Sequence, residues 1–305
     1  MKFDQVTPRN HPVLSYKKNM NQEVTSSSNT GLVAQYYSYS QKYYRWFLGG
    51  SQHHGFHPSG RKISERKAQK NMLEKLAEEL QLPPITSNLR ILDAGSGQGI
   101  TSIYLAEKYG CRVDGVTVTP SEVSTALKNA KKRGVAELTD FFLMDYSNTL
   151  FEDETFDRVF TLETLSHALD VQKALTEFYR ILKPGGRIVL FEYTMADDKQ
   201  FNASDFAILD MLTAASGSDG LKQIREENFQ DLVGEVGFSD VTMKDISRNT
   251  LPTLTYLKKL LFLFYWYSSW RGNLKDHPNR LTAVEVSRMV RAGLIKYQII
   301  TALKK

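Results

Sequence analysis

Two side chains that can exchange protons, Glu163 and His167, lie four residues apart in the sequence. Carboxylate and imidazole groups are common general acids and bases, and four residues of helix place two side chains on one face. We therefore predict that both face a ligand cleft as acid and base. Glu192, which ends a later apolar segment, is a third candidate acid. Structural alternatives stay open: Glu163 orients the pocket, His167 caps a helix, and Glu192 is a buried, hydrogen-bonded acid.

A glycine-rich run, LDAGSGQG at residues 92–99, follows an apolar segment and precedes a segment with helical periodicity. Glycines in such a turn let the backbone approach a ligand closely. The run does not match the dinucleotide fingerprint, because Ile100 stands where that fingerprint has its third glycine. Asp93 would repel a phosphate but suits an ammonium or sulfonium group. The run therefore predicts a turn that binds a positively charged, nucleotide-like ligand.

Apolar segments and helical segments alternate along the chain. The segments predicted as strands are 89–92, 112–117, 138–144, 156–162, 187–193, 240–246 and about 294–301, and the main predicted helices are 120–133, 171–182 and 226–236. A Lys-Pro-Gly-Gly turn at residues 183–186 separates a helix from a strand. The alternation predicts an α/β fold with a mostly parallel sheet, an antiparallel last strand and ligands at the carboxyl ends of the strands.

Several separate segments resemble class I S-adenosylmethionine-dependent methyltransferases. The glycine run with Asp93 resembles motif I of that class. Residues 160–168 resemble the sterol-methyltransferase stretch in which histidine follows an acid by four positions, and Phe-Glu-Tyr at 191–193 is similar to its Tyr-Glu-Trp element. Residues 36–48 resemble the aromatic N-terminal helix that covers the cofactor, and residues 54–57 the start of the next loop. The resemblance is greatest for the branch of sterol C-methyltransferases and cyclopropane fatty-acid synthases.

This resemblance implies a Rossmann-like, seven-stranded class I methyltransferase sheet with additions at both ends. We expect an N-terminal helical cap at residues 31–85 and an S-adenosylmethionine-binding methyltransferase domain at 86–305. Within that domain, the aromatic stretch at about 251–291 is expected to form a helical lid insertion. Residues 1–30 are polar, lack the apolar core of a signal peptide, and are expected to form a flexible leader.

The same resemblance implies a cofactor site. Thr117 stands where many class I enzymes place an acid for the ribose hydroxyls, so Glu122 is expected to accept them instead. The alternative for Glu122 is charge compensation in the first turn of a helix. Asp145 and Tyr146 are expected near the adenine amino group, with a turn-forming aspartate as the alternative. The implied cofactor-binding residues are Tyr37, Asp93, Gly95, Ser96, Gly97, Gly99, Thr117, Glu122, Asp145, Tyr146 and Glu163.

The acceptor is expected to be hydrophobic, because aromatic residues are frequent in the predicted cap and lid. The lid contains the most apolar segment of the chain, but lysines interrupt it and it is shorter than the ~20 residues of a membrane span. The expected substrate-binding residues are Tyr43, Trp46, Phe47, His54, Tyr193 and Phe264. The loop at 49–60 lacks the cysteine with which cyclopropane synthases help to hold bicarbonate, so ring formation is disfavoured.

Composition excludes several other classes of protein. The single cysteine, Cys111, leaves neither a disulfide framework nor a thiolate metal site, and favours a reducing, cytoplasmic setting. No metal is expected. The net charge of +5 is spread over basic runs at helical spacing, which are usually solvated helix faces. Residues 161–164 read Thr-Leu-Glu-Thr where a nucleic-acid methyltransferase would have an Asn/Asp-Pro-Pro-aromatic tetrad. No nucleic acid partner is therefore expected.

The sequence thus predicts an S-adenosylmethionine-dependent methyltransferase whose substrate is a sterol-, terpenoid- or lipid-like small molecule. C-methylation is favoured, since the aromatic residues can stabilise a carbocation. The first alternative is N-, O- or S-methylation of a specialised metabolite. The second is a protein that binds the cofactor without methyl transfer, for example an isomerising enzyme that uses the sulfonium as a fixed charge. The interpretation also leaves room for peripheral membrane contact and for a homodimer.

Overall fold

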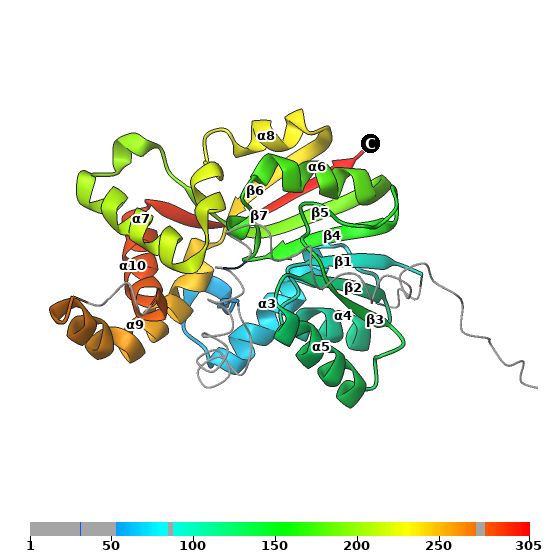
Figure 1. The fold of residues 1–305 in the computed structure, drawn as a ribbon, viewed down its shortest axis with the longest axis horizontal. Coiled ribbons are helices and arrows are strands. Elements are labelled where there is room, and N and C mark those ends of the chain that lie inside the picture. The colour runs from blue at the N-terminus through cyan, green and yellow to red at the C-terminus, as the bar shows by residue number, and fades with distance from the viewer. Residues whose placement is uncertain (1–30, 32–52, 85–87, 273–277) are drawn as a thin grey trace, which may run out of the picture.

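The computed structural model describes Gly31 and residues 53–84, 88–272 and 278–305. Its centre is a seven-stranded sheet with the strand order β3-β2-β1-β4-β5-β7-β6 (Figure 1). The strands are β1 (Arg90–Ala94), β2 (Arg112–Thr117), β3 (Thr139–Leu143), β4 (Phe156–Leu162), β5 (Leu182–Met195), β6 (Phe238–Asp245) and β7 (Ile295–Lys304). β1 to β5 pair in parallel, and β7 is antiparallel to both β5 and β6. The predicted α/β class and the antiparallel end of the sheet are confirmed.

Helices cover both faces of the sheet. They are α3 (Glu65–Glu79), α4 (Ile100–Tyr109), α5 (Pro120–Arg133), α6 (Val171–Ile181), α7 (Ala203–Ser216), α8 (Phe229–Glu235), α9 (Ser247–Trp270) and α10 (Pro278–Ala292), with short 3-10 turns η1 (Pro58–Gly60), η2 (Leu165–His167), η3 (Asp198–Gln200) and η4 (Asp219–Gln223). Figure 1 shows α6 and α8 on one face and α3, α4 and α5 on the other.

Alternation of side chains along the central strands builds a core on each face. In β1, Ile91 belongs to the cluster under α3, α4 and α5, while its neighbour Leu92 belongs to the cluster under α6 and α8. Both side chains are fully buried, as expected for a parallel strand covered on both faces. A third cluster joins α7, α9 and α10 to the ends of β5 and β7, through residues such as Leu209, Leu254 and Met289.

Most predicted elements agree with the structure, and the differences have local causes. The predicted 112–117 and 120–133 segments coincide with β2 and α5. The expected turn at 183–186 is wrong: β5 begins at Leu182, directly after α6, and Gly185 with its positive φ of 74° lies inside the strand range. The helix α7 is missing from the predictions, although Asn202 and Asp205 form a capping box at its start.

The expected lid and cap are described in part. The 251–291 stretch is not one insertion segment but contains two helices, α9 and α10, which pack against each other through the third cluster. Of the expected cap, residues 53–84 are described, and α3 packs against the sheet with Met72 and Leu76. Residues 1–30 lie outside the described residues, so the leader stays a prediction, as do the domain boundaries.

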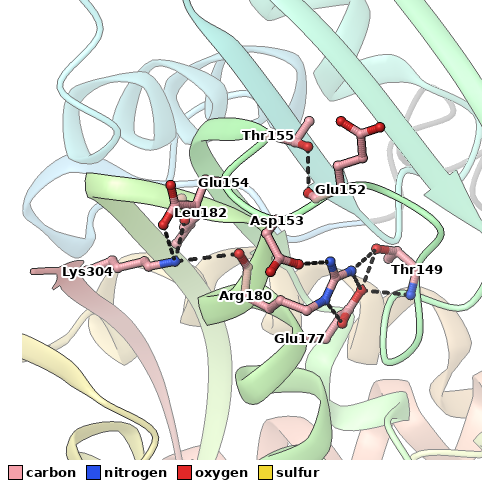
Figure 2. Close-up of polar contacts among 9 residues, drawn as sticks. All are labelled: Thr149, Glu152, Asp153, Glu154, Thr155, Glu177, Arg180, Leu182 and Lys304. Atoms are coloured by element: carbon pink, nitrogen blue, oxygen red, sulfur yellow. Dashed lines mark hydrogen bonds and ion pairs between the residues drawn. The ribbon is translucent and has the colours of Figure 1, made fainter.

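The ends of α6, β5 and β7 are tied together by a polar network (Figure 2). The Arg180 guanidinium donates to Glu177 Oε1 at 2.6 Å and to Asp153 Oδ1 at 2.6 Å. Lys304 Nζ donates to the carbonyl oxygen of Leu182 at 2.8 Å. Because Leu182 begins β5 and Lys304 ends the antiparallel β7, this network lies at the edge of the sheet opposite to the carboxyl ends of the parallel strands.

Candidate active site

The glycine run forms a tight turn between β1 and α4. Gly95 has φ of 98° and Gly99 has φ of 75°, both in the left-handed region that favours glycine. The Gly95 and Ser96 N–H groups donate to the Val116 carbonyl at 3.0 and 2.8 Å, which holds the turn against β2. A Cβ atom on Gly95 would lie 2.5 Å from Thr164 Cγ2. The glycine therefore allows close approach of the loop after β4, a neighbour that the sequence did not indicate.

A cavity of about 780 Å³, partly open to solvent, lies beside this turn. It opens at the carboxyl ends of β1, β2 and β4, where the strand order reverses direction, the usual ligand position in open α/β sheets. Its lining residues are His53, Asp93, Gly95, Ser96, Gly97, Gln98, Ile100, Thr101, Thr117, Val118, Thr119, Glu122, Tyr146, Leu162, Glu163, Thr164 and His167. Eight of the residues predicted to bind the cofactor are in this lining, including Asp93, Glu122 and Tyr146.

Asp93 is a buried acid in the cavity wall. Its Oδ2 accepts a hydrogen bond of 2.6 Å from the Ser102 hydroxyl. Burial raises the pKa of Asp93 from 3.8 to about 7, because removal from water disfavours the charged carboxylate. A cation bound in the cavity would favour that carboxylate and lower its pKa. Asp93 is therefore placed to bind a positively charged ligand group.

Thr117 and Glu122 form one polar unit on the opposite wall. The Thr117 hydroxyl donates to Glu122 Oε2 at 2.8 Å, and both side chains are buried. A carboxylate that only compensated helix charge would be expected at the surface, so this burial favours the ligand-binding interpretation of Glu122. Tyr146 also lines the cavity, and its hydroxyl donates to the Thr164 carbonyl at 2.7 Å.

Two predicted cofactor residues are not in the cavity lining. Asp145 Oδ1 accepts a hydrogen bond of 2.7 Å from the Ser147 N–H, which is the turn-forming arrangement given as the alternative. Gly99 is the N-cap of α4, and a Cβ on it would lie 2.6 Å from Phe141. Its left-handed conformation therefore serves helix packing. A third predicted residue, Tyr37, lies outside the described residues.

Glu163 is the centre of a buried polar cluster at the end of β4. Its Oε2 lies 2.7 Å from His54 Nδ1, and its Oε1 accepts 2.6 Å and 2.8 Å hydrogen bonds from the His54 N–H and the Tyr297 hydroxyl. Burial by itself would raise the pKa of Glu163, but the interaction with His54 outweighs it and the pKa lies below its ordinary value. The cluster therefore keeps Glu163 ionised in the cavity wall.

Two tyrosines complete this cluster. The Tyr193 hydroxyl lies 3.3 Å from His54 Nδ1, and the rings of Tyr193 and Tyr297 meet edge to face at 4.9 Å. Burial raises the pKa of both phenols well above 10.0, so both stay neutral. His54 and Tyr193, predicted to bind substrate, are outside the cavity lining and instead surround Glu163.

The predicted pairing of Glu163 with His167 on one helical turn is wrong. Glu163 has φ of 62° and precedes η2, so the two residues share no helix. Both nevertheless line the cavity. His167 Nδ1 donates to the Gly217 carbonyl at 3.1 Å, and burial lowers the pKa of the imidazole, which is therefore neutral near pH 7.

Glu192 has the structural position given as its alternative. It is fully buried, outside the cavity lining, and its Oε1 accepts hydrogen bonds from the N–H groups of Thr164 and Leu165 at 3.0 and 2.8 Å. Burial raises its pKa to about 7. Glu192 therefore holds the loop that presents Glu163.

The predicted aromatic substrate contacts are mostly untested. Tyr43, Trp46 and Phe47 lie outside the described residues. Phe264 is 55% exposed on α9, with the Arg280 guanidinium 5.5 Å from its ring centre, and is not in the cavity lining. Its predicted role as a substrate contact is therefore unsupported by its position.

Sequence reasoning missed two residues of the site. His53 lines the cavity, and Tyr297 donates to Glu163 from the last strand. Tyr297 comes to the site because β7 pairs antiparallel with β5, where it lies opposite Tyr193. No local spacing indicates such a contact, because 134 residues separate Tyr297 from Glu163.

These residues fit the expected cofactor, S-adenosylmethionine. The buried Asp93 carboxylate suits a cationic group, and the Thr117–Glu122 unit offers a carboxylate for sugar hydroxyls. Glycines form the turn between them, where larger side chains would collide with neighbouring loops. No group of three or more His, Cys, Asp or Glu residues suited to hold a metal ion occurs in the described part of the chain.

Comparison with known proteins gives the family. A family model described as "Methyltransferase domain" matches residues 92–190. The S-adenosyl-L-methionine-dependent Diels-Alderase iccD of Talaromyces variabilis is 31% identical over 249 residues, 78% of this chain and 82% of that protein. The 24-methylenesterol C-methyltransferase 2 of Oryza sativa subsp. japonica is 26% identical, over 83% of this chain and 68% of that protein.

A solved structure supports the same conclusion for the fold. The cyclopropane synthase MmaA2 from Mycobacterium tuberculosis superposes with a TM-score of 0.76, over 92% of this chain and all of that one, at 17% identity. The strand order, the cavity at the glycine turn and the sequence relatives thus agree. The chain is an enzyme of the class I S-adenosylmethionine-dependent methyltransferase family, in its sterol C-methyltransferase and cyclopropane-synthase-like branch, with S-adenosylmethionine as cofactor.

Proposed function

We propose that this enzyme transfers a methyl group to a carbon atom of a hydrophobic small molecule of a sterol-, terpenoid- or lipid-like kind. The observation that carries this proposal is Glu163, a buried carboxylate kept ionised in the cavity wall by His54 and Tyr297. Methylation of an alkene carbon leaves a cation on the acceptor, and an ionised buried carboxylate both stabilises that cation and accepts a proton from it. The similarity to a sterol C-methyltransferase supports the same chemistry.

S-adenosylmethionine supplies an electrophilic methyl group when bound. Asp93 binds a cationic part of the cofactor, and Glu122, positioned by Thr117, accepts hydrogen bonds from its hydroxyl groups. The glycine turn positions the cofactor without side chains of its own. The main contribution of the protein is to align the acceptor with the methyl group and to exclude water, because alignment accounts for much of the rate in such displacements.

The proton released from the acceptor goes to Glu163. Its lowered pKa keeps it deprotonated before the reaction, and the His54 interaction holds both of its oxygens in place. Glu163 is therefore the catalytic base in this proposal, and His54 and Tyr297 are positioning residues. His167, neutral and in the same cavity, is a second group that can carry a proton away from the site.

The test is transfer from methyl-labelled S-adenosylmethionine into lipid and polar extracts, with mass spectrometry of every labelled product. We expect label on carbon in an apolar product. Label on nitrogen, oxygen or sulfur would overturn C-methylation in favour of heteroatom transfer. A Glu163→Gln variant should bind cofactor normally and give much less labelled product, while Asp145→Asn, outside the cavity lining, serves as the matched control.

A second candidate function is ring formation without methyl transfer. It is favoured by the relative at 31% identity that is named an S-adenosyl-L-methionine-dependent Diels-Alderase. In that case a polyene would react in the same cavity and S-adenosylmethionine would stay unchanged. Mass spectrometry separates the two functions: an isomer of equal mass with intact labelled cofactor supports cyclisation, and a mass gain of one methylene group with loss of labelled methyl supports transfer.

A further inference from the structure

The second half of α9 carries an unusual concentration of exposed apolar side chains. Leu263, Trp266 and Trp270 are 75%, 63% and 72% exposed, although side chains of this size are usually covered in proteins. Phe262, Phe264 and Tyr267 are also exposed beside them. We call these six residues the outer face of α9. Figure 1 shows α9 and α10 at one end of the molecule, at the lower left.

The outer face follows from the helical spacing of α9. Leu263, Trp266 and Trp270 are three and four residues apart and form one stripe, and Lys259 precedes Leu263 by a further four residues on the same stripe. The opposite stripe contains Leu254 and Leu261, which are buried. The packing of α9 against the rest of the enzyme thus uses one side of the helix and leaves the other to solvent.

The first half of α9, in contrast, is anchored. His57 Nε2 donates to Thr253 Oγ1 at 2.9 Å, and the Thr253 hydroxyl donates to Glu65 Oε2 at 2.8 Å, which ties the helix to η1 and α3. The outer face therefore lies on the distal half of a helix that is held firmly at its base. None of its six residues is in the cavity lining, so the catalytic site does not explain them.

The net positive charge of the protein is also concentrated here. Residues 247–292, from the start of α9 to the end of α10, contain eight Lys or Arg and two acidic residues, a net charge of +6 against +5 for the whole chain. The expectation of evenly spread basic runs is therefore wrong. α9 itself contains no acidic residue. On α10, Glu285 is buried between the Tyr265 hydroxyl and Arg288.

We propose that the outer face of α9 docks the enzyme on an anionic phospholipid surface. Exposed tryptophan and tyrosine flanked by basic residues is the composition of helices that lie in the membrane interface, where rings sit at headgroup level and Lys or Arg contact phosphates. Lys259 and Arg271, at the two ends of the exposed stripe, are both exposed and suit that contact.

The charge argues against the two other occupants of such a surface. A second copy of the chain would bring two regions of +6 together, and like charges across an interface oppose association. A membrane span is not available, since no helix in the described ranges is long and apolar enough to cross a bilayer. An anionic surface satisfies both the apolar side chains and their basic neighbours.

The test is sedimentation of the full chain with vesicles of phosphatidylcholine alone and of phosphatidylcholine with phosphatidylserine. We expect binding to the second kind only, weakening as salt is raised. Two of the three tryptophans of the chain are on the outer face, so their emission should shift to the blue on binding. This readout does not depend on turnover and is independent of the proposed function.

Variants locate the surface. Lys259→Gln with Arg271→Gln should weaken binding by about fivefold for each charge removed. Trp266→Ser with Trp270→Ser should abolish the blue shift and most of the binding. The matched controls are Lys131→Gln with Lys132→Gln, exposed at the end of α5, and Leu150→Ser, an exposed leucine far from α9 in the sequence. Neither control should change binding.

Several results would overturn the proposal. Equal binding to both kinds of vesicle, or binding that survives the charge variant, would remove the anionic surface. A concentration-dependent dimer in sedimentation equilibrium that Trp266→Ser with Trp270→Ser dissociates would assign the outer face to a second copy. If the tryptophan variants do not fold, the charge variant and the salt dependence of the unmodified chain decide the question.

Discussion

At the residue scale, Asp93 determines how cofactor binding depends on pH. Its pKa is about 7 in the free enzyme, so half of the molecules must lose a proton there before the carboxylate can bind a cation. Affinity for S-adenosylmethionine should therefore rise as pH increases through about 7 and level off above it. Calorimetric titration across this range measures the effect.

The variant Asp93→Asn should keep the hydrogen bond to Ser102 but lose the charge. We expect affinity to fall by about tenfold to a hundredfold and to stop varying with pH near 7. Asp145→Asn, whose side chain closes its own turn, should change neither quantity. Unchanged affinity in Asp93→Asn would show that Asp93 does not contact the cofactor.

Glu163 should be required for turnover and not for cofactor binding. Glu163→Gln keeps the shape of the side chain and removes the base, so turnover should fall about a hundredfold or more, the usual contribution of a general base. Calorimetric affinity for S-adenosylmethionine should change little. Equal losses in turnover and in affinity would instead give Glu163 the structural role of orienting the pocket.

His54 should act through Glu163 and can be tested by its effect on the pH profile. Without His54, burial dominates and the pKa of Glu163 rises. In His54→Gln the acidic limb of the turnover profile should therefore move to higher pH, because more base is protonated at a given pH. Tyr297→Phe, which removes one hydrogen bond and no charge, should move it less. An unmoved limb in His54→Gln would contradict this coupling.

At the scale of elements, the contact between the glycine turn and the loop after β4 shapes the cavity. Gly95→Ala would combine a strained φ of 98° with a Cβ 2.5 Å from Thr164. Gly110→Ala is the matched control, since Gly110 has φ of 70° and no atom within 4 Å of the added Cβ. Backbone strain of about 1–2 kcal/mol applies to both.

The two glycine variants should therefore differ in function more than in backbone strain. Gly110→Ala should lower the free energy of unfolding by that strain and leave cofactor affinity intact. Gly95→Ala should be less stable than Gly110→Ala and should lose cofactor affinity, because Thr164 must move. Denaturant unfolding and calorimetry measure the two quantities. Equal behaviour of the variants would show that the Gly95–Thr164 contact is unimportant.

Periodic and local features of this chain are readable from the sequence, and contacts between distant segments are not. β2 and α5 have the predicted bounds because alternating apolar residues and a proline at the helix start are local signals. α7 was missed although Asn202 and Asp205 form a recognisable cap. The Glu163 cluster was misassigned, because its partners come from residue 54 and from β7, and only the folded sheet brings them together.

At the scale of the whole molecule, chemistry and stabilisation lie at opposite edges of one sheet. The cavity is at the carboxyl ends of the parallel strands, and the Arg180 network closes the other edge (Figure 2). Substitutions in that network should therefore change stability without changing the properties of the site. This separation allows folding and catalysis to be altered independently in one chain.

Arg180→Gln tests that separation. Glu177 would lose its charged partner while largely buried, so the free energy of unfolding should fall by about 1–3 kcal/mol at neutral pH. Burial would raise the pKa of Glu177, but Arg180 and Thr149 hold it below its ordinary value of 4.5, so this stabilisation is present above pH 4.5 and is lost as pH falls through the lowered pKa. The variant and the unmodified enzyme should therefore converge in stability in acid.

Arg133→Gln is the matched control for Arg180→Gln. Arg133 pairs with Glu107 on the exposed faces of α5 and α4, and exposed ion pairs contribute less than about 1 kcal/mol. Denaturant unfolding at neutral and acid pH measures both variants, and calorimetry checks that cofactor affinity is unchanged. Equal destabilisation by the two variants would mean that the network around Arg180 is worth no more than a surface ion pair, and a loss of cofactor affinity in Arg180→Gln would mean that the two edges of the sheet are coupled.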